Sequence, residues 1–225
     1  MSTEYPKIET VFDRDESFNV IENKLRLPEF NIIKTWQVTE KVDGTNIRIL
    51  YEKDCPNVEF YGRTDNAQIP SFLLKYLQQT FVASKLNDVF ANLNQFQLVV
   101  LYGEGYGAKI QKGGGNYRPK DVSFRLFDVK IGGLWLTLES VQDIATKLGI
   151  KTVPYLGEYT LDNIVTLVKS EPISIVAKED SDNLNHIMEG VIARTNPLLL
   201  RRNGSRLMWK LKVSDYKHAK SGIIK

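Results

Sequence analysis

Two short stretches near opposite ends of the chain place lysines where they could act on a phosphate. In Lys41-Val42-Asp43-Gly44, Lys41 and Asp43 are two residues apart in a predicted strand, so their side chains are expected on one face. A lysine amine attacks phosphorus only when it is neutral, and its reference pKa of about 10.4 means that burial or neighbouring cations must help. The alternative is an exposed lysine beside an Asp-Gly turn.

The second stretch is Trp209-Lys210-Leu211-Lys212. Strand alternation puts both ammonium groups on one face and the apolar side chains on the other. Such a pair could hold an α-phosphate and favour the neutral form of a nearby amine. A strand with one solvated lysine face explains the pattern equally well, so neither stretch identifies a site by itself.

A glycine-rich stretch lies midway along the chain, at residues 103–107, and three more glycines follow at 113–115. It lacks the spacing of a P-loop, and no helix pattern follows it as a dinucleotide-binding fingerprint requires. We therefore expect a mobile surface loop.

Hydrophobic periodicity predicts the elements that must position these residues. A β-hairpin is expected over 36–51 and 58–63, and a long amphipathic helix over 71–93. Further strands are expected at 96–102, 123–131, 135–138, 191–194 and 207–213. Two more helices are expected, one at 140–149 with Ser140 as its N-cap and one at 160–168. Because strands outnumber helices without strict alternation, the expected class is α+β with an antiparallel or mixed sheet.

Composition excludes several classes of protein. The 225 residues are 42% hydrophobic and 25% charged, as in ordinary globular chains. Cys55 is the single cysteine, so no internal disulfide is possible, and neither a secretory signal nor a membrane-spanning run is evident. A cytoplasmic location is expected, in the host if the protein is viral. The two histidines lack zinc-ligand neighbours. The net charge is only +3, but residues 194–225 carry +8.

Four further blocks separate the two lysine stretches. They are Tyr61-Gly62-Arg63-Thr64, Leu101-Tyr102-Gly103-Glu104-Gly105, Phe124-Arg125-Leu126-Phe127-Asp128-Val129 and Met188-Glu189-Gly190-Val191-Ile192-Ala193-Arg194. Over residues 40–212 the ordered set resembles the covalent nucleotidyltransferase superfamily of polynucleotide ligases and mRNA capping enzymes. The flanks at 40–46, 109–112 and 202–206 look like the ATP-dependent RNA ligases of the phage RNA ligase 2 type. Members of that type often carry His at position 43, and DNA ligases share the Lys-x-Asp-Gly block.

The resemblance implies a three-step reaction. Lys41 would attack the α-phosphate of ATP, releasing pyrophosphate and retaining AMP. The AMP would pass to a 5′-phosphate end, and a 3′-hydroxyl would then attack that end and expel AMP. Lys210 and Lys212 would bind the α-phosphate, and Glu189 would help to hold Mg²⁺ or Mn²⁺.

The same resemblance implies contacts to the nucleotide. Arg63 and Glu104 would bind the sugar and neighbouring phosphate, and Phe127 would stack on adenine. Glu40 would contribute to base recognition and Asn46 to the strand-joining step. Without the family, Phe127 is as well explained as a core ring, Arg63 as a surface hairpin residue and Glu104 as a loop carboxylate.

The family fold is an ATP-grasp-like ligase domain, in which antiparallel or mixed sheets with flanking helices surround a nucleotide cleft. Only 13 residues follow Lys212, which is too few for an OB-fold or helical C-terminal domain. We therefore expect residues 1–225 to be a single nucleotidyltransferase domain and a monomer. The short stretch before Lys41 favours ATP over NAD.

The leading hypothesis is an ATP-dependent RNA ligase of the phage type that acts in RNA repair. Its substrate would be RNA with 5′-phosphate and 3′-hydroxyl ends, including nicked duplexes. A minimal DNA ligase acting on DNA, a guanylyltransferase and a non-catalytic nucleic-acid-binding module of the same fold stay open. Six cations of the basic segment are expected to face a polynucleotide backbone: Arg194, Arg201, Arg202, Arg206, Lys217 and Lys220.

Overall fold

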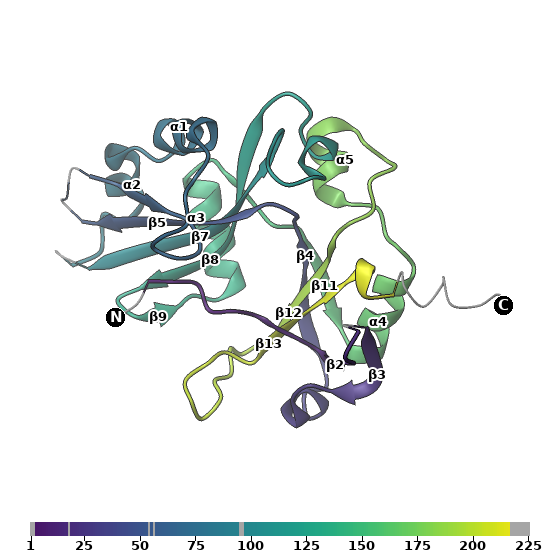
Figure 1. Ribbon diagram of the computed structural model, residues 1–225. Coiled ribbons are helices and arrows are strands. Elements are labelled where there is room, and N and C mark those ends of the chain that lie inside the picture. Colours follow the sequence, from purple (N-terminus) through teal and green to yellow (C-terminus); the bar gives the residue numbers. More distant parts are fainter. Residues whose placement is uncertain (1–2, 18, 54, 56, 95–96, 217–225) are drawn as a thin grey trace. The chain divides into compact units, whose positions relative to one another are not determined.

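The computed structural model describes residues 3–216 apart from residues 18, 54, 56 and 95–96 (Figure 1). Its elements fall into two units, each built from two stretches of chain. Unit 1 comprises Met1–Tyr5 and Asp43–Val153, and unit 2 comprises Pro6–Val42 and Pro154–Lys225. Both units combine helices with mixed sheets, so the predicted α+β class is confirmed.

Unit 1 is organised around a six-stranded sheet in the order β10-β8-β7-β5-β6, with β9 beside β8. Its long strands are β5 (Thr45–Glu52), β7 (Leu98–Gly107) and β8 (Val122–Ile131). The short strands are β6 (Glu59–Tyr61), β9 (Leu134–Trp135) and β10 (Lys151–Thr152). Neighbouring strands are antiparallel except for β8 and β10, which are parallel.

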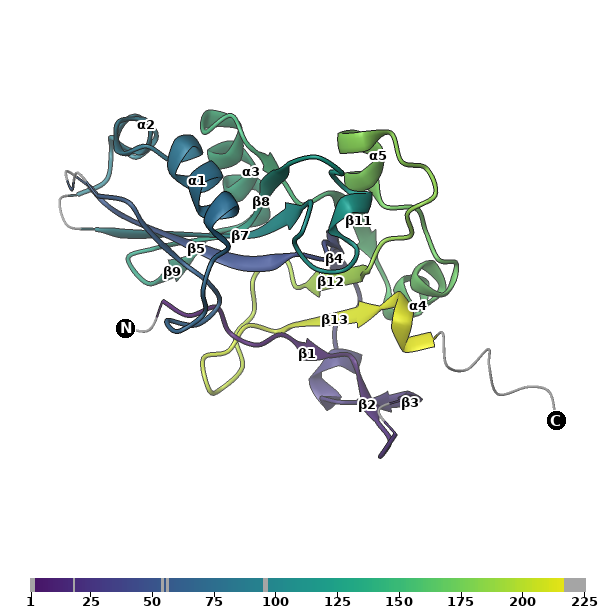
Figure 2. The ribbon, with the colours of Figure 1, turned by 45° about the horizontal axis from the view of Figure 1, so that its top comes forward.

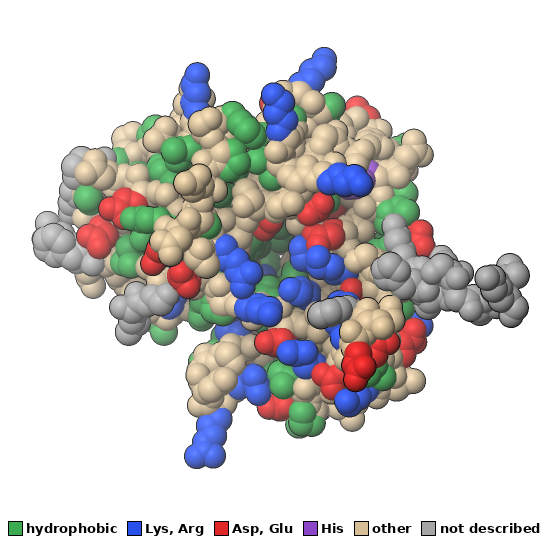
Figure 3. All heavy atoms as spheres, in the orientation of Figure 1, with side chains coloured by type: hydrophobic (Ala, Val, Ile, Leu, Met, Phe, Trp, Pro, Cys, Tyr) green, Lys and Arg blue, Asp and Glu red, His purple; other side chains and the backbone are tan. Residues whose placement is uncertain are grey.

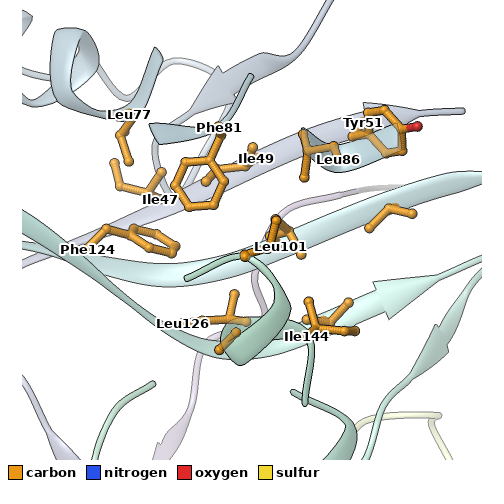
Figure 4. Packing of buried hydrophobic residues seen from close by; sticks show 14 of the residues in the cluster. Ile47, Ile49, Tyr51, Leu77, Phe81, Leu86, Leu101, Phe124, Leu126 and Ile144 are labelled. Atoms are coloured by element: carbon orange, nitrogen blue, oxygen red, sulfur yellow. The ribbon is translucent and has the colours of Figure 1, made fainter. Parts of the chain in front are cut away.

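Three helices bury the apolar face of this sheet: α1 (Ser71–Thr80), α2 (Ala83–Val89) and α3 (Leu138–Lys147). Figure 4 shows Leu77 and Ile144 from the helices beside Ile47, Leu101 and Leu126 from the sheet. Burying each of these aliphatic side chains stabilises the fold by about 1.5–3 kcal/mol relative to exposure. A short 3₁₀ helix, η2 (Gly114–Asn116), follows β7.

The prediction of one long helix over 71–93 is wrong, because the chain forms two helices there, α1 and α2. Phe81 leaves the helical conformation, and Val82 is extended at φ −90° and ψ 146°. The break turns the Phe81 ring inward, where it is 1% exposed and lies edge-on to Phe124 at 5.3 Å between centroids. The cap of α3 also differs from the prediction, since Thr137 rather than Ser140 is the N-cap and accepts a hydrogen bond from the Ser140 amide.

The glycine-rich stretch at 103–107 is not a surface loop, which corrects the sequence prediction. It is the second half of β7, and β7 lies between β5 and β8. A Cβ atom on Gly103 would lie 2.1 Å from the Phe124 ring, and one on Gly44 would lie 2.3 Å from the Gly105 carbonyl oxygen. The glycines therefore serve close packing rather than mobility.

Unit 2 contains a five-stranded sheet in the order β1-β13-β12-β4-β11. The strands are β1 (Glu9–Thr10), β4 (Trp36–Lys41), β11 (Tyr155–Tyr159), β12 (Gly190–Arg194) and β13 (Met208–Lys212). Figure 2 shows β1 and β12 on either side of β13; β1 runs parallel to β13 and the other pairs are antiparallel. The hairpin expected over 36–51 and 58–63 is confirmed for its second part, since β5 and β6 pair, but corrected for its first, because β4 belongs to this other sheet.

The core of unit 2 is centred on two tryptophans. Trp36 and Trp209 are both fully buried, with ring centroids 5.4 Å apart and Phe30 alongside. Two helices complete the unit, α4 (Leu161–Lys169) with the N-cap Thr160, and α5 (Ile175–Ser181) with the N-cap Ser174. The smaller elements are β2 (Phe12–Arg14), β3 (Val20–Leu25) and the 3₁₀ helices η1 (Pro28–Asn31) and η3 (Val213–Tyr216). No helix in the described part of the chain is long and apolar enough to cross a membrane.

Candidate functional site

The two lysine stretches meet on neighbouring strands of the unit 2 sheet. Lys41 of β4 lies opposite Gly190 of β12, and Gly190 lies opposite Lys212 of β13. Directly opposed residues of adjacent strands project to the same face, so Lys41 and Lys212 share one side of the sheet. Figure 3 shows Lys and Arg side chains gathered over this region of unit 2.

Glu189 joins the two lysines. Its Oε2 atom lies 2.5 Å from Nζ of Lys41, and its Oε1 atom lies 2.6 Å from Nζ of Lys212. The side chains of Lys41 and Glu189 are 22% and 16% exposed, and that of Lys212 is 35% exposed. The carboxylate thus bridges two ammonium groups, and the three side chains keep a net charge of +1 in a cluster that is open to solvent.

Gly190 makes this arrangement possible. A Cβ atom at this position would lie 2.2 Å from the carbonyl oxygen of Leu211 and 2.7 Å from Cα of Lys212. No real Cβ contact is that short, so β12 can approach β13 closely only with glycine here. The Glu-Gly pair in the sequence therefore positions the carboxylate beside Lys212.

The predicted alternation of β13 is confirmed. Trp209 and Leu211 are fully buried, and Val213 beyond the strand is 3% exposed, whereas Lys210 and Lys212 are only partly buried. Lys210 lies opposite Ile192 of β12, two residues from Lys212 on the same face.

Glu40 faces the opposite side of the sheet from Lys41, among the core residues of unit 2. It is 1% exposed, and its carboxylate accepts hydrogen bonds from the Ser174 hydroxyl and from the amides of Ile175 and Val176 at 2.9 and 3.3 Å. The negative charge is thereby stabilised at the N-terminus of α5, whose first amides have no partner within the helix. Glu40 holds α5 to the strand that carries Lys41, and its role in base recognition stays a prediction.

The remaining candidates belong to unit 1. Asn46 of β5 lies directly opposite Glu104 of β7, so the structure brings two sequence-predicted residues together on adjacent strands. The side-chain oxygen of Asn46 is buried and has no hydrogen-bond partner among the described residues. Buried polar atoms are nearly always paired in folded proteins, so this oxygen is a candidate contact for a ligand.

Within unit 1, the turn at Asp43 and Gly44 is tied to the segment that follows β7. The Asp43 amide donates to the Tyr117 hydroxyl at 3.2 Å, and the Gln111 side chain donates to the Gly44 carbonyl oxygen at 3.2 Å. Asp43 follows β4 rather than lying within it, which corrects the prediction that Lys41 and Asp43 share a strand face.

Arg63 is exposed two residues after the end of β6, and an arginine that sequence analysis missed holds the residue before it. Arg48 is fully buried and donates to the Gly62 carbonyl oxygen at 2.7 Å, to the Thr3 hydroxyl at 2.8 Å and to Asp65 at 2.7 Å. An arginine between two isoleucines, Ile47 and Ile49, was the available signal, because a buried guanidinium needs acceptors on several sides.

Phe127 is partly buried in β8 and lies edge-on to Tyr5, with ring centroids 5.0 Å apart at 67°. The Tyr5 hydroxyl donates to Asp128, and its ring also contacts Trp135. The N-terminal segment therefore orients Phe127, a contact that no local sequence pattern signals.

The basic segment is only partly as expected. Arg194 is 6% exposed, so it is buried rather than facing a polynucleotide, which corrects the prediction. Nε of Arg201 lies 3.5 Å from Oε1 of Glu29, and Arg202 is exposed. Lys217 and Lys220 lie outside the described residues.

A model of the RNA ligase family matches residues 34–212, which is most of the chain. The chain belongs to the RNA ligase family. The match begins just before β4 and ends at Lys212, so both lysine stretches and Glu189 lie inside it. No curated protein matches the sequence significantly.

Solved structures with the same fold as this RNA ligase family member come from a Naegleria gruberi RNA ligase. A lysine-to-alanine variant with ATP and manganese matches with a TM-score of 0.60 at 20% identity, over 97% of this chain and 59% of that chain. A variant with AMP and manganese matches with a TM-score of 0.60 at 20% identity, over 96% of this chain and 59% of that chain. A structure with pyrophosphate matches with a TM-score of 0.60 at 20% identity, over 96% of this chain and 64% of that chain. This chain thus spans about three fifths of the length of those chains.

Proposed function

We propose that this chain is the nucleotidyltransferase part of an ATP-dependent RNA ligase that forms a covalent lysyl-AMP on Lys41. The observation that carries the proposal is the carboxylate of Glu189 held between Lys41 and Lys212, in a chain that belongs to the RNA ligase family. The Naegleria gruberi RNA ligase structures were solved with ATP, AMP or pyrophosphate, which correspond to the substrate, the retained group and the leaving group of such a step.

The reaction at Lys41 is a displacement at phosphorus. The Nζ lone pair forms a bond to the α-phosphorus, the bond to the bridging oxygen breaks, and pyrophosphate leaves with that electron pair. Before the attack the Lys41 ammonium must lose one proton to expose this lone pair, and Oε2 of Glu189 lies within hydrogen-bond reach to accept it. The nitrogen loses a second proton to solvent as the bond to phosphorus forms. Lys212 and Lys210 share the face of Lys41 and offset the charge that develops on the phosphate oxygens.

The donor set fits a hard divalent cation. Within the described residues no three His, Cys, Asp or Glu side chains gather into a metal-binding cluster, so Glu189 would be joined by water and phosphate oxygens. Mg²⁺ typically binds nucleotides through one or two carboxylates in this way. Bound there, Mg²⁺ or Mn²⁺ would neutralise phosphate charge.

The residues of unit 1 keep the roles that the family suggests. We assign Arg63 and Glu104 to the ribose and neighbouring phosphate and Phe127 to adenine stacking. Asn46 is assigned to the strand-joining step, and its unpaired buried oxygen supports a ligand contact. In unit 2, Glu40 is assigned to base recognition, from its position at the N-terminus of α5.

The finer parts of the proposal concern substrate and origin. We infer an enzyme of the phage RNA ligase 2 type that repairs RNA ends, acting as a monomer on 5′-phosphate and 3′-hydroxyl termini. The block order and the flanks at 40–46 and 109–112 support this. Nicked duplexes that differ only in RNA or DNA on the 3′-hydroxyl side separate it from a DNA ligase, because RNA-specific proteins use the 2′-hydroxyl.

The decisive experiment is incubation of the full chain with α-labelled ATP and Mg²⁺ or Mn²⁺. We expect an acid-labile label on the protein that Lys41→Ala abolishes. Equal labelling of Lys41→Ala, or labelling from GTP in preference to ATP, would contradict the proposal. RNA binding without any adduct under either metal would instead favour the non-catalytic module.

A further inference from the structure

Unit 1 carries a hollow of about 610 Å³ between α1 and the segment that joins β7 to β8. Helix α1 contributes Phe72, Lys75 and Tyr76 to it, and the opposite wall includes Lys109 and Lys120. Basic side chains project from the surface along α1 and this segment in Figure 3. The volume lies within the range of about 300–1,000 Å³ for ligand sites, which exceeds what one phosphate needs.

The charge of this hollow is unbalanced. Among the described residues that line it, Asp121 is the one acidic side chain. Arg118 donates two hydrogen bonds of 2.6 and 2.7 Å to this carboxylate, so the two charges cancel. Lys75, Lys109 and Lys120 are all exposed, and none forms an ion pair with another described residue. The hollow therefore presents three uncompensated positive charges to a ligand.

An aromatic surface lies beside these lysines. Phe72 is 41% exposed on the outer side of α1, while Leu73 and Leu77 on the inner side are fully buried in the core. Tyr76 is half-buried, and its hydroxyl lies 3.4 Å from that of Ser123 across the hollow. Burial of Leu73 and Leu77 accounts for the packing of α1, so the exposed Phe72 ring has no structural need to be aromatic.

We propose that this hollow binds single-stranded RNA, with Lys75, Lys109 and Lys120 on phosphates and Phe72 stacked under an unpaired base. Lysines beside exposed aromatic rings are how proteins hold single strands without reading their sequence. An acidic protein would form ion pairs with the lysines but would offer no base to stack on Phe72, so RNA fits the hollow better. The proposal rests on the RNA ligase function and adds a substrate contact on residues outside Lys41, Glu189 and Lys212.

The test is fluorescence anisotropy of the full chain with a labelled, 5′-phosphorylated single-stranded RNA at several salt concentrations. Lys75→Ala, Lys109→Ala and Lys120→Ala combined should weaken binding roughly tenfold or more and lower the salt slope by about 2, at about 0.7 per phosphate contact. The corresponding Lys→Arg triple variant should retain binding. Phe72→Ala should weaken binding roughly tenfold with the salt slope unchanged.

A charge-matched control removes three exposed lysines elsewhere, with Lys7→Ala, Lys34→Ala and Lys178→Ala combined. Equal weakening in this control, unchanged binding in the first triple variant, or no RNA binding by the wild-type chain would each overturn the inference. Tighter binding of polyglutamate than of RNA at equal charge would also overturn it, in favour of an acidic protein partner. Labelling by ATP alone should be normal in every variant, and its absence from the wild-type chain would refute the ligase proposal separately.

Discussion

Oε2 of Glu189 lies 2.5 Å from Nζ of Lys41, across the boundary between β12 and β4. The other oxygen of the same carboxylate lies 2.6 Å from Nζ of Lys212 on β13. One carboxylate is therefore shared by two lysines on the neighbouring strands β4 and β13. A ligand that binds this carboxylate removes the counterion of both ammonium groups. The charge at Glu189 therefore affects how readily Lys41 can give up a proton and attack.

Glu189→Gln tests this link. The amide keeps the shape of the side chain but loses its charge, so lysyl-AMP formation should slow by about 100-fold or more. Stability to urea should change by no more than about 1 kcal/mol, because all three side chains are partly exposed. Glu158→Gln, at an exposed position of β11, is the control and should label normally. Normal labelling of Glu189→Gln would contradict the proposed role.

Gly190→Ala should damage the fold as well as the site. The added Cβ would lie 2.2 Å from the Leu211 carbonyl oxygen, so β12 and β13 must separate. Overpacking of this kind costs about 1–3 kcal/mol of unfolding free energy. Gly115→Ala is the matched control, since nothing lies within 4 Å of its Cβ position. Thermal denaturation compares the two, and an equally small effect of both substitutions would refute the close-packing explanation.

The unit 2 sheet shows what sequence patterns could predict. The lysine face of β13 and the extent of α4 follow from local periodicity and a local cap at Thr160, and both predictions are confirmed. The family blocks also predicted a role for Glu189 beside the two lysine stretches. Its pairing with two lysines depends on the strand order β13-β12-β4, in which sequence neighbours are not spatial neighbours, so no local pattern indicated it.

The errors in unit 1 have the same origin. Glycines at 103–107 indicate a loop by composition, but the Phe124 ring of the adjacent strand leaves no space for a Cβ on Gly103. The periodicity of 71–93 continues through Phe81, and the helix breaks there because burying that ring favours a turn. In both cases tertiary packing outweighs local preference.

Ser174→Ala should be more costly than the loss of an ordinary helix cap. The Ser174 hydroxyl accepts a hydrogen bond from the Ala177 amide at 3.1 Å and donates to the buried Glu40. Losing the cap costs about 1 kcal/mol, and leaving Glu40 short of a donor adds about 1–3 kcal/mol. Thr160→Ala removes only an exposed cap on α4 and should cost about 1 kcal/mol or less. Equal costs in urea denaturation would show that the bond to Glu40 contributes nothing.

Arg48→Met tests whether the buried arginine positions Arg63. Methionine fills the apolar space but leaves the Gly62 carbonyl oxygen and the Thr3 hydroxyl without their donor, so unfolding free energy should fall by about 2–4 kcal/mol. If Gly62 anchors Arg63 for nucleotide binding, the ATP concentration that gives half-maximal labelling should rise, as it should in Arg63→Ala. Arg26→Met, at a partly exposed arginine paired with Glu9, is the control and should leave that concentration unchanged. A destabilised Arg48→Met with unaltered ATP dependence would make Arg48 a purely structural residue.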